Sequence, residues 1–205
     1  MNGGYEISQH IKDEFVGVSH GDLKRFKELL SKYPGLATVT ASWGETPIEA
    51  AAQMVQREMI EMLLAAGAPL DICTAAVMGM EDLVKAMLDD DPGLKDATGA
   101  HGIPVMYFPV VGGYQSIAEI LLAAGADVNA SEEGNAPLHG AAMFGRTQMA
   151  KWLIAHGANV NGADYEGKTP LKIALAHGDE EMARILREHG GVEQIEEDAD
   201  ALASY

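Results

Sequence analysis

The chain has 205 residues, of which 47% are hydrophobic, so it can form one domain with a core or a stack of small units, and it is too apolar for a disordered chain. Its formal net charge of −17 repels phosphate groups, so we expect neither nucleic acids nor anionic membranes as partners, and basic peptides, basic proteins or uncharged ligands fit better. No apolar run approaches the ~20 residues of a membrane span, no signal peptide is visible, and the single cysteine, Cys73, cannot form an internal disulfide, so we expect a cytoplasmic protein.

Two stretches in the first half of the chain resemble each other over a long distance. After a segment at 1–12, a first unit is expected at 13–43, and GDLKRFKELLSKYPGL begins within it at Gly21. The similar stretch GMEDLVKAMLDDDPGL begins 58 residues later at Gly79, within a unit expected at 73–101. This similarity indicates that both units have the same helical structure.

Four further copies share a shorter pattern. They define units that we expect at 44–72, 102–133, 134–166 and 167–191. In each copy a second glycine follows the opening glycine after 23 residues, and these second glycines are Gly67, Gly125, Gly157 and Gly190. Self-similarity of this kind is typical of repeat proteins. An acidic tail at 192–205 follows, and we expect it to be partly ordered.

Each copy predicts a pair of short helices. Thr46-Pro47 and Thr169-Pro170 are expected to open first helices, because a hydroxyl can cap a helix and proline suits its first position. The second helix carries apolar residues at helical spacing, as Met59, Ile60 and Leu63 show. One such pair cannot bury its apolar face alone, so the copies must stack.

The motifs APLHGAA at 136–142 and TPLKIA at 169–174 resemble the TPLHxAA signature of ankyrin repeats. GADVNA at 125–130 and GANVNG at 157–162 are similar to the sequence that closes such a repeat. The resemblance covers residues 13–191 and implies an all-α solenoid with short hairpin-like loops, called fingers below. It also implies a concave face made by the fingers and the first helices, and a monomer that binds a protein or peptide.

Two irregularities lie near the middle of the predicted stack. A finger is absent between Ala68 and Cys73, and the copy at 102–133 keeps only Pro104 of its opening and has Pro109 where other copies have a small residue. Proline inside a helix costs about 3 kcal/mol, so this first helix should be kinked or shortened. We expect either a central pocket, near Tyr107, Pro109 and His139, or a degenerate repeat that its neighbours hold in place.

Other motifs offer no recognisable catalytic or metal site. GVSHG at 17–21 fits the nucleophile pattern G-x-S-x-G, but it aligns with the end of a first helix and lacks the required strand. The seven histidines show no metal-ligand spacing, and no phosphate-cradling motif is present. We therefore expect no metal, no cofactor and no catalytic residue. In ankyrin repeats the imidazole at the position of His139 usually bonds backbone between neighbouring units.

The resemblance also indicates which residues face a partner, namely those at the fingertips and at the ends of the first helices. The fingertips supply Trp43, Glu45, His101, Ile103, Glu132, Glu133, Asn135, Tyr165 and Glu166. The helix ends supply Met54, Met78, Met143, Phe144 and His177. Apolar residues in this set would form a strip that marks an interaction surface, unless they turn into the core between repeats.

These observations favour a non-catalytic module that binds a protein or peptide through an apolar concave face with an acidic rim. A scaffolding or toxin-neutralising role is the same activity with a dedicated partner. The alternative is a small-molecule binder or enzyme that uses the central pocket, with His101, Tyr107 and His139 as acid–base groups.

Overall fold

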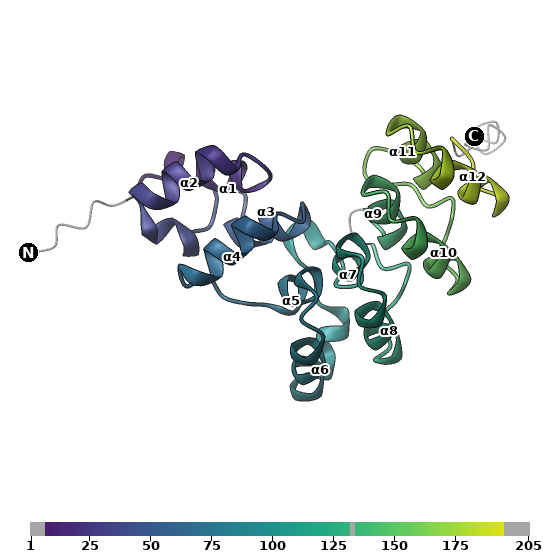
Figure 1. Ribbon diagram of the computed structural model, residues 1–205, viewed down its shortest axis with the longest axis horizontal. Coiled ribbons are helices and arrows are strands. Elements are labelled where there is room, and N and C mark those ends of the chain that lie inside the picture. Colours follow the sequence, from purple (N-terminus) through teal and green to yellow (C-terminus); the bar gives the residue numbers. More distant parts are fainter. Residues whose placement is uncertain (1–6, 132–133, 195–205) are drawn as a thin grey trace, which may run out of the picture.

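The protein is an all-α solenoid of paired helices, seen here in a computed structural model that describes residues 7–131 and 134–194 (Figure 1). The helices of these residues are α1 (Gln9–Ser19), α2 (Leu23–Lys32), α3 (Pro47–Gln53), α4 (Arg57–Ala65), α5 (Ile72–Met78), α6 (Glu81–Asp90), α7 (Tyr107–Gly112), α8 (Gln115–Ala123), α9 (Pro137–Met143), α10 (Thr147–Ala155), α11 (Pro170–Ala176) and α12 (Glu180–Glu188). Three short 3-10 helices lie between pairs, at Pro34–Thr38, Pro92–Asp96 and Ala100–Gly102. None of the helices in these ranges is long and apolar enough to cross a membrane.

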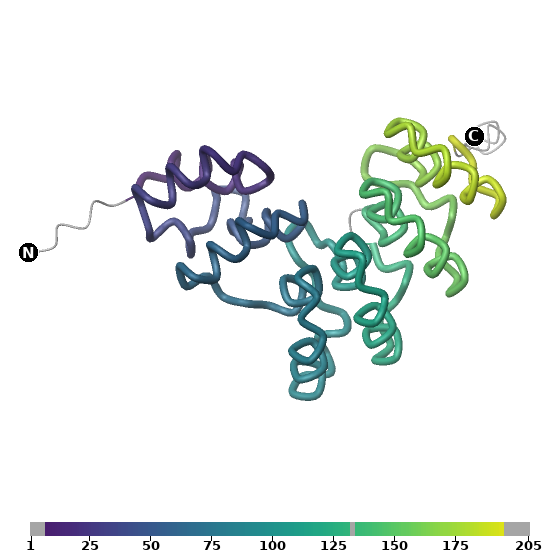
Figure 2. Tube along the Cα trace, viewed as in Figure 1, coloured from purple at the N-terminus to yellow at the C-terminus, as the bar shows by residue number. Residues whose placement is uncertain are grey.

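The helix pairs stack side by side into an arc. The first helices of the pairs (α1, α3, α5, α7, α9 and α11) pack one against the next and line the inside of the curve (Figure 1). The second helices lie on the outside, and α1 and α12 are at opposite ends of the arc (Figure 2). The arrangement therefore has one concave side, lined by first helices.

The first helices begin where the capping residues predict. The side chain of Thr46 accepts from the backbone of Glu49, whose carboxylate accepts in turn from Thr46 N. The side chain of Thr169 caps α11 by accepting from Lys172 N, and Asp71 caps α5 through Thr74 N at 2.6 Å. These side chains satisfy amide groups that a helix start otherwise leaves without partners.

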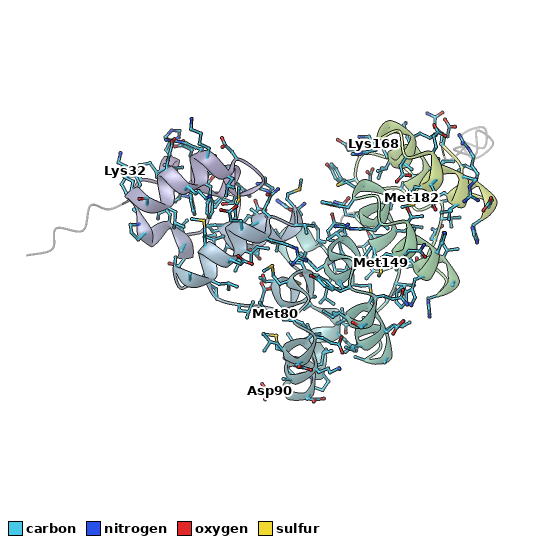
Figure 3. All side chains as sticks on the ribbon, in the orientation of Figure 1. Lys32, Met80, Asp90, Met149, Lys168 and Met182 are labelled. Carbon is cyan, nitrogen blue, oxygen red and sulfur yellow. The ribbon has the colours of Figure 1, made fainter. Side chains whose placement is uncertain are left out.

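Small residues let the first helices approach closely. Ala51 of α3 and Ala141 of α9 are fully buried. Apolar residues of the second helices, such as Leu63 and Leu153, fill the space behind them. The labelled Met149 and Met182 lie inside the last part of the stack (Figure 3) and are buried. Most of the core is thus one large cluster along the arc, and a second, small cluster contains Val16, Ala41 and Ala50.

Asparagines of the repeat-closing motifs join neighbouring units. Asn129 donates to Gly157 O at 3.0 Å and accepts from Asn159 N at 2.7 Å. Asn161 makes the same pair of bonds one unit later, to Gly190 O and from Val192 N. Each amide side chain therefore satisfies two backbone groups of the next unit, which links the units in a fixed register.

The missing finger leaves a distinctive junction between the second and third pairs. The chain runs from the end of α4 at Ala65 to α5 at Ile72 without a hairpin. Arg57 at the start of α4 spans this junction, because its guanidinium donates to Val77 O of α5 at 3.3 Å and contacts the Tyr114 hydroxyl. One side chain thus joins three units.

Pro109 does not kink its helix. α7 begins at Tyr107, later than the repeat pattern predicts, and it has six residues, whereas α9 has seven. Pro109 therefore lies in the first turn, where amides have no partner within the helix. Just before Pro109, Phe108 N donates to Val105 O at 3.2 Å, which forms a turn tighter than that of an α-helix. The helix is shortened and the interior-proline cost is avoided.

Candidate interaction face

The fingers are short loops that lead from one helix pair into the next first helix. The first finger, 41–45, is closed by a bond from Ala41 N to Glu45 O at 2.8 Å. The second, 97–105, carries bonds from Gly99 N to Ile103 O and from Val105 N to Ala97 O, both at 2.8 Å. In the fourth, 163–168, Asp164 N donates to Lys168 O. The third contains residues 132–133, so the predicted Glu132 and Glu133 lie outside the described residues.

Large apolar side chains are exposed on this face. Trp43, Met143 and Tyr165 are 49%, 40% and 70% exposed, and among the described residues only Val192 joins them as an exposed large apolar side chain. Met54, Met78 and Phe144 are half-buried at the ends of first helices. Trp43 precedes α3 in the N-terminal half of the arc, whereas Met143 and Tyr165 belong to the C-terminal half. Apolar side chains are thus presented along the whole arc, in two groups.

The polar residues predicted for the face divide into exposed and buried ones. His101, Glu166 and His177 are exposed, and Asn135 is half-buried. Glu45 is only 3% exposed and Ile103 only 2%, so the prediction that these two side chains lie on the surface is wrong. Ile103 turns inward because its backbone carbonyl closes the second finger and its side chain joins the core.

The central pocket predicted at the third full copy is not formed in the described part of the chain. Tyr107, Pro109 and His139 are all buried. The Tyr107 ring packs against Gly140 so closely that a Cβ there would come within 2.5 Å of it. His139 Nε2 donates to Gly162 O at 2.9 Å, the backbone contact that the ankyrin resemblance implies. A hollow of about 190 Å³ lies instead beneath the second finger, lined by Thr98, Pro104 and Met106 among others.

Beside the first finger, four side chains from three elements meet. Trp43 Nε1 donates to Glu45 Oε2 at 2.8 Å. On the other carboxylate oxygen, His20 Nε2 lies 3.2 Å and His101 Nε2 3.7 Å from Oε1. Neither imidazole is aligned for a hydrogen bond with Oε1, so this buried oxygen has no hydrogen-bond donor among the described residues. The backbone at His101 is left-handed, with φ of 57°, which is uncommon for a residue with a side chain.

The electrostatics of this cluster favour a charged carboxylate. Burial would raise the pKa of Glu45, but its contacts with His20 and Trp43 outweigh burial and lower the pKa. Contact with Glu45 raises the pKa of His20, against a smaller opposing effect of burial. Elsewhere, burial lowers the pKa of His139 and raises those of Tyr107 and Cys73. Within 7–131 and 134–194, no three His, Cys, Asp or Glu side chains are placed to hold a metal ion.

The sequence predicted Trp43, Glu45 and His101 on the face separately, and their contact with one another and with His20 was not predicted. Glu45 and His101 are far apart in sequence, and they meet because no finger separates the first finger from the second. The absent finger at 68–71 was visible in the sequence. The left-handed turn at His101, which directs its imidazole back toward Glu45, gave no sequence signal.

The fold defines a repeat protein built from stacked pairs of helices. A family profile described as Ankyrin repeats (3 copies) matches residues 110–198. The chain is 31% identical over 134 residues to the cyclin-dependent kinase 4 inhibitor B of Bos taurus, an alignment that covers 63% of this chain and 99% of that protein. This protein belongs to the ankyrin repeat family, which indicates a protein-interaction module.

Larger relatives contain a similar region. The chain is 30% identical over 166 residues to the nuclear factor NF-kappa-B p105 subunit of Gallus gallus, covering 74% of this chain and 17% of that protein. It is 31% identical over 167 residues to the human SH3 and multiple ankyrin repeat domains protein 2, covering 74% of this chain and 9% of that protein. The chain thus spans less than a fifth of either of these two relatives.

Proposed function

We propose that this protein is a non-catalytic, cytoplasmic monomer that binds a protein or peptide through its concave face. The observation that carries the proposal is the exposure of Trp43, Met143 and Tyr165 along that face. Aromatic and methionine side chains are the types that anchor protein interfaces, because they bury much apolar area with few torsions to fix.

The charge of the protein favours a basic partner. The net charge is −17, and Glu166 is exposed beside Tyr165 on the fourth finger. An acidic rim raises the association rate of a basic partner, and this effect weakens as the salt concentration rises.

Cys73 is buried and its thiol pKa is raised, so this thiol is not poised to act as a nucleophile.

Affinity capture with mass spectrometry identifies a partner, and calorimetric titration with the purified partner then tests the face. Trp43→Ala or Phe144→Ala should weaken binding by at least about 1–2 kcal/mol, and the affinity should fall moderately as salt rises. Val192→Ala is the matched control, because Val192 is exposed and apolar but lies after α12 and is not one of the residues predicted for the face. If both face variants bind the partner like the wild type, the assignment of the face is wrong.

A further inference from the structure

A hollow of about 330 Å³ separates the first finger from the second. It is lined by Trp43, Gly44, Glu45 and Glu49 on one side and by Gly99, Ala100 and His101 on the other. Pockets for small molecules span roughly 300–1,000 Å³. The volume of this hollow is at the lower end of that range, which suits a single long side chain. It exists because the second and third helix pairs have no finger between them.

The lining of the hollow is negative. Glu45 and Glu49 contribute two carboxylates. Glu49 accepts two hydrogen bonds from Thr46, and both are made to its Oε2, so they do not occupy its Oε1. Glu45 is only 3% exposed. Its Oε1 has no hydrogen-bond donor within the described residues. A buried acceptor without a donor is costly, so a donor brought by a ligand would be favourable there.

The hollow also has an aromatic wall with a fixed orientation. Half of the Trp43 side chain is exposed, while its Nε1 is held by Glu45 Oε2 at 2.8 Å. An indole face attracts a cation placed over it. A guanidinium can stack on such a face and donate to a carboxylate at the same time. It is also less strongly hydrated than an ammonium, so it loses less hydration free energy on entering a partly dry site.

We infer that this hollow is the subsite for an arginine side chain of the protein partner, with Glu45 and Glu49 as acceptors and Trp43 as the stacking surface. The inference rests on the proposed function and gives the face a specific anchor. The imidazoles near Glu45 are those of His20, at the C-terminal cap of α1, and His101 of the second finger. Protonated His20 would repel the guanidinium, so the subsite should bind arginine better at alkaline than at acidic pH.

The test uses the whole chain, labelled with ¹⁵N, and three blocked tripeptides: acetyl-Gly-Arg-Gly-amide, its citrulline analogue and its lysine analogue. The Trp43 indole N–H signal is followed by NMR, with that of buried Trp152 as an internal reference. The arginine peptide should shift the Trp43 signal saturably and leave Trp152 unchanged. Citrulline, which keeps the shape without the charge, should bind at least about tenfold more weakly.

Variants assign the effect to the hollow. Glu45→Gln should weaken arginine-peptide binding by at least about tenfold, whereas Glu61→Gln, an exposed position on the outer helix α4, should leave it unchanged. If Glu45→Gln does not fold, Trp43→Ala serves instead, followed through the Gly44 and His101 amide signals. Binding should also weaken when the pH is lowered from about 8 to about 5.5, through the range in which histidine protonates.

The outcomes separate this inference from the proposed function. No saturable shift, an equal affinity for citrulline, or a tighter affinity for lysine would overturn the arginine subsite. In that case the loss of partner binding in Phe144→Ala would still support the face. A clear arginine shift with a partner that ignores the face variants would instead overturn the proposed function, and the hollow would then be an arginine site that this partner does not use.

Discussion

Two glycines lie inside helices of this protein in very different surroundings. A Cβ added at Gly140 of α9 would come within 2.8 Å of both Tyr107 and Val111, whereas one added at Gly17 of α1 would meet nothing within 4 Å. Alanine gains up to about 1 kcal/mol of helix propensity over glycine, but overpacking a dense core costs about 1–3 kcal/mol. Urea denaturation should therefore show that Gly140→Ala lowers the free energy of unfolding and that Gly17→Ala raises it. Stabilisation of both variants would mean that the interface between α7 and α9 is loose.

The contact between His20 and Glu45 predicts a pH dependence of stability. The pKa of His20 is raised in the folded state by Glu45. Its contribution is therefore fully present below the unfolded value of about 6.5 and is lost as the pH rises through the folded value. Because His20 is partly exposed, the contribution should be at most about 1 kcal/mol.

Urea unfolding of the wild type and His20→Gln between about pH 6 and pH 8.5 measures this contribution. The stability advantage of the wild type should shrink as the pH rises. The comparison between variants isolates His20 from His139, whose lowered pKa acts in the opposite direction. Two parallel curves would show that the contact with Glu45 does not hold the proton of His20.

At the scale of the element, α7 shows how a repeat accommodates a proline. Pro109 replaces a small residue, but α7 starts late enough to place it in the first turn. Pro109→Ala should therefore not recover the ~3 kcal/mol of an interior proline. We expect it to destabilise by about 1 kcal/mol, because the unfolded chain gains freedom and the buried ring leaves space. A stabilisation of 2 kcal/mol or more in urea denaturation would mean that the proline strains α7.

The elements differ in how much of them the sequence predicts. Thr46, Thr169 and their following prolines mark helix starts because capping is a local interaction, and these starts are confirmed. The late start of α7 was not predicted, since it depends on the packing of Tyr107 against α9. The burial of Glu45 was missed for the same reason, because the residues that cover it come from other units.

At the scale of the whole molecule, a solenoid is as stable as its weakest junction, since each unit contacts only its neighbours. The junction between α4 and α5 lacks a finger, so Arg57 takes a larger share of the coupling there. Besides its bond to Val77 O, its guanidinium lies 5.4 Å from the centre of the Tyr114 ring. Tyr114 in turn packs on Gly79, where a Cβ would come within 2.4 Å of it.

Arg57→Met keeps the length of the side chain and removes its donors, so it should weaken this junction by about 1–2 kcal/mol. The loss should appear in native-state hydrogen exchange as faster exchange of the amides in α1 to α4, with α9 to α12 unchanged, because the two sides become less dependent on each other. Arg184→Met is the control, since Arg184 is exposed and, among the described residues, forms an ion pair only with Glu188 of its own helix. Equal acceleration on both sides of the junction would show that the arc unfolds as one unit and that Arg57 does not couple its halves.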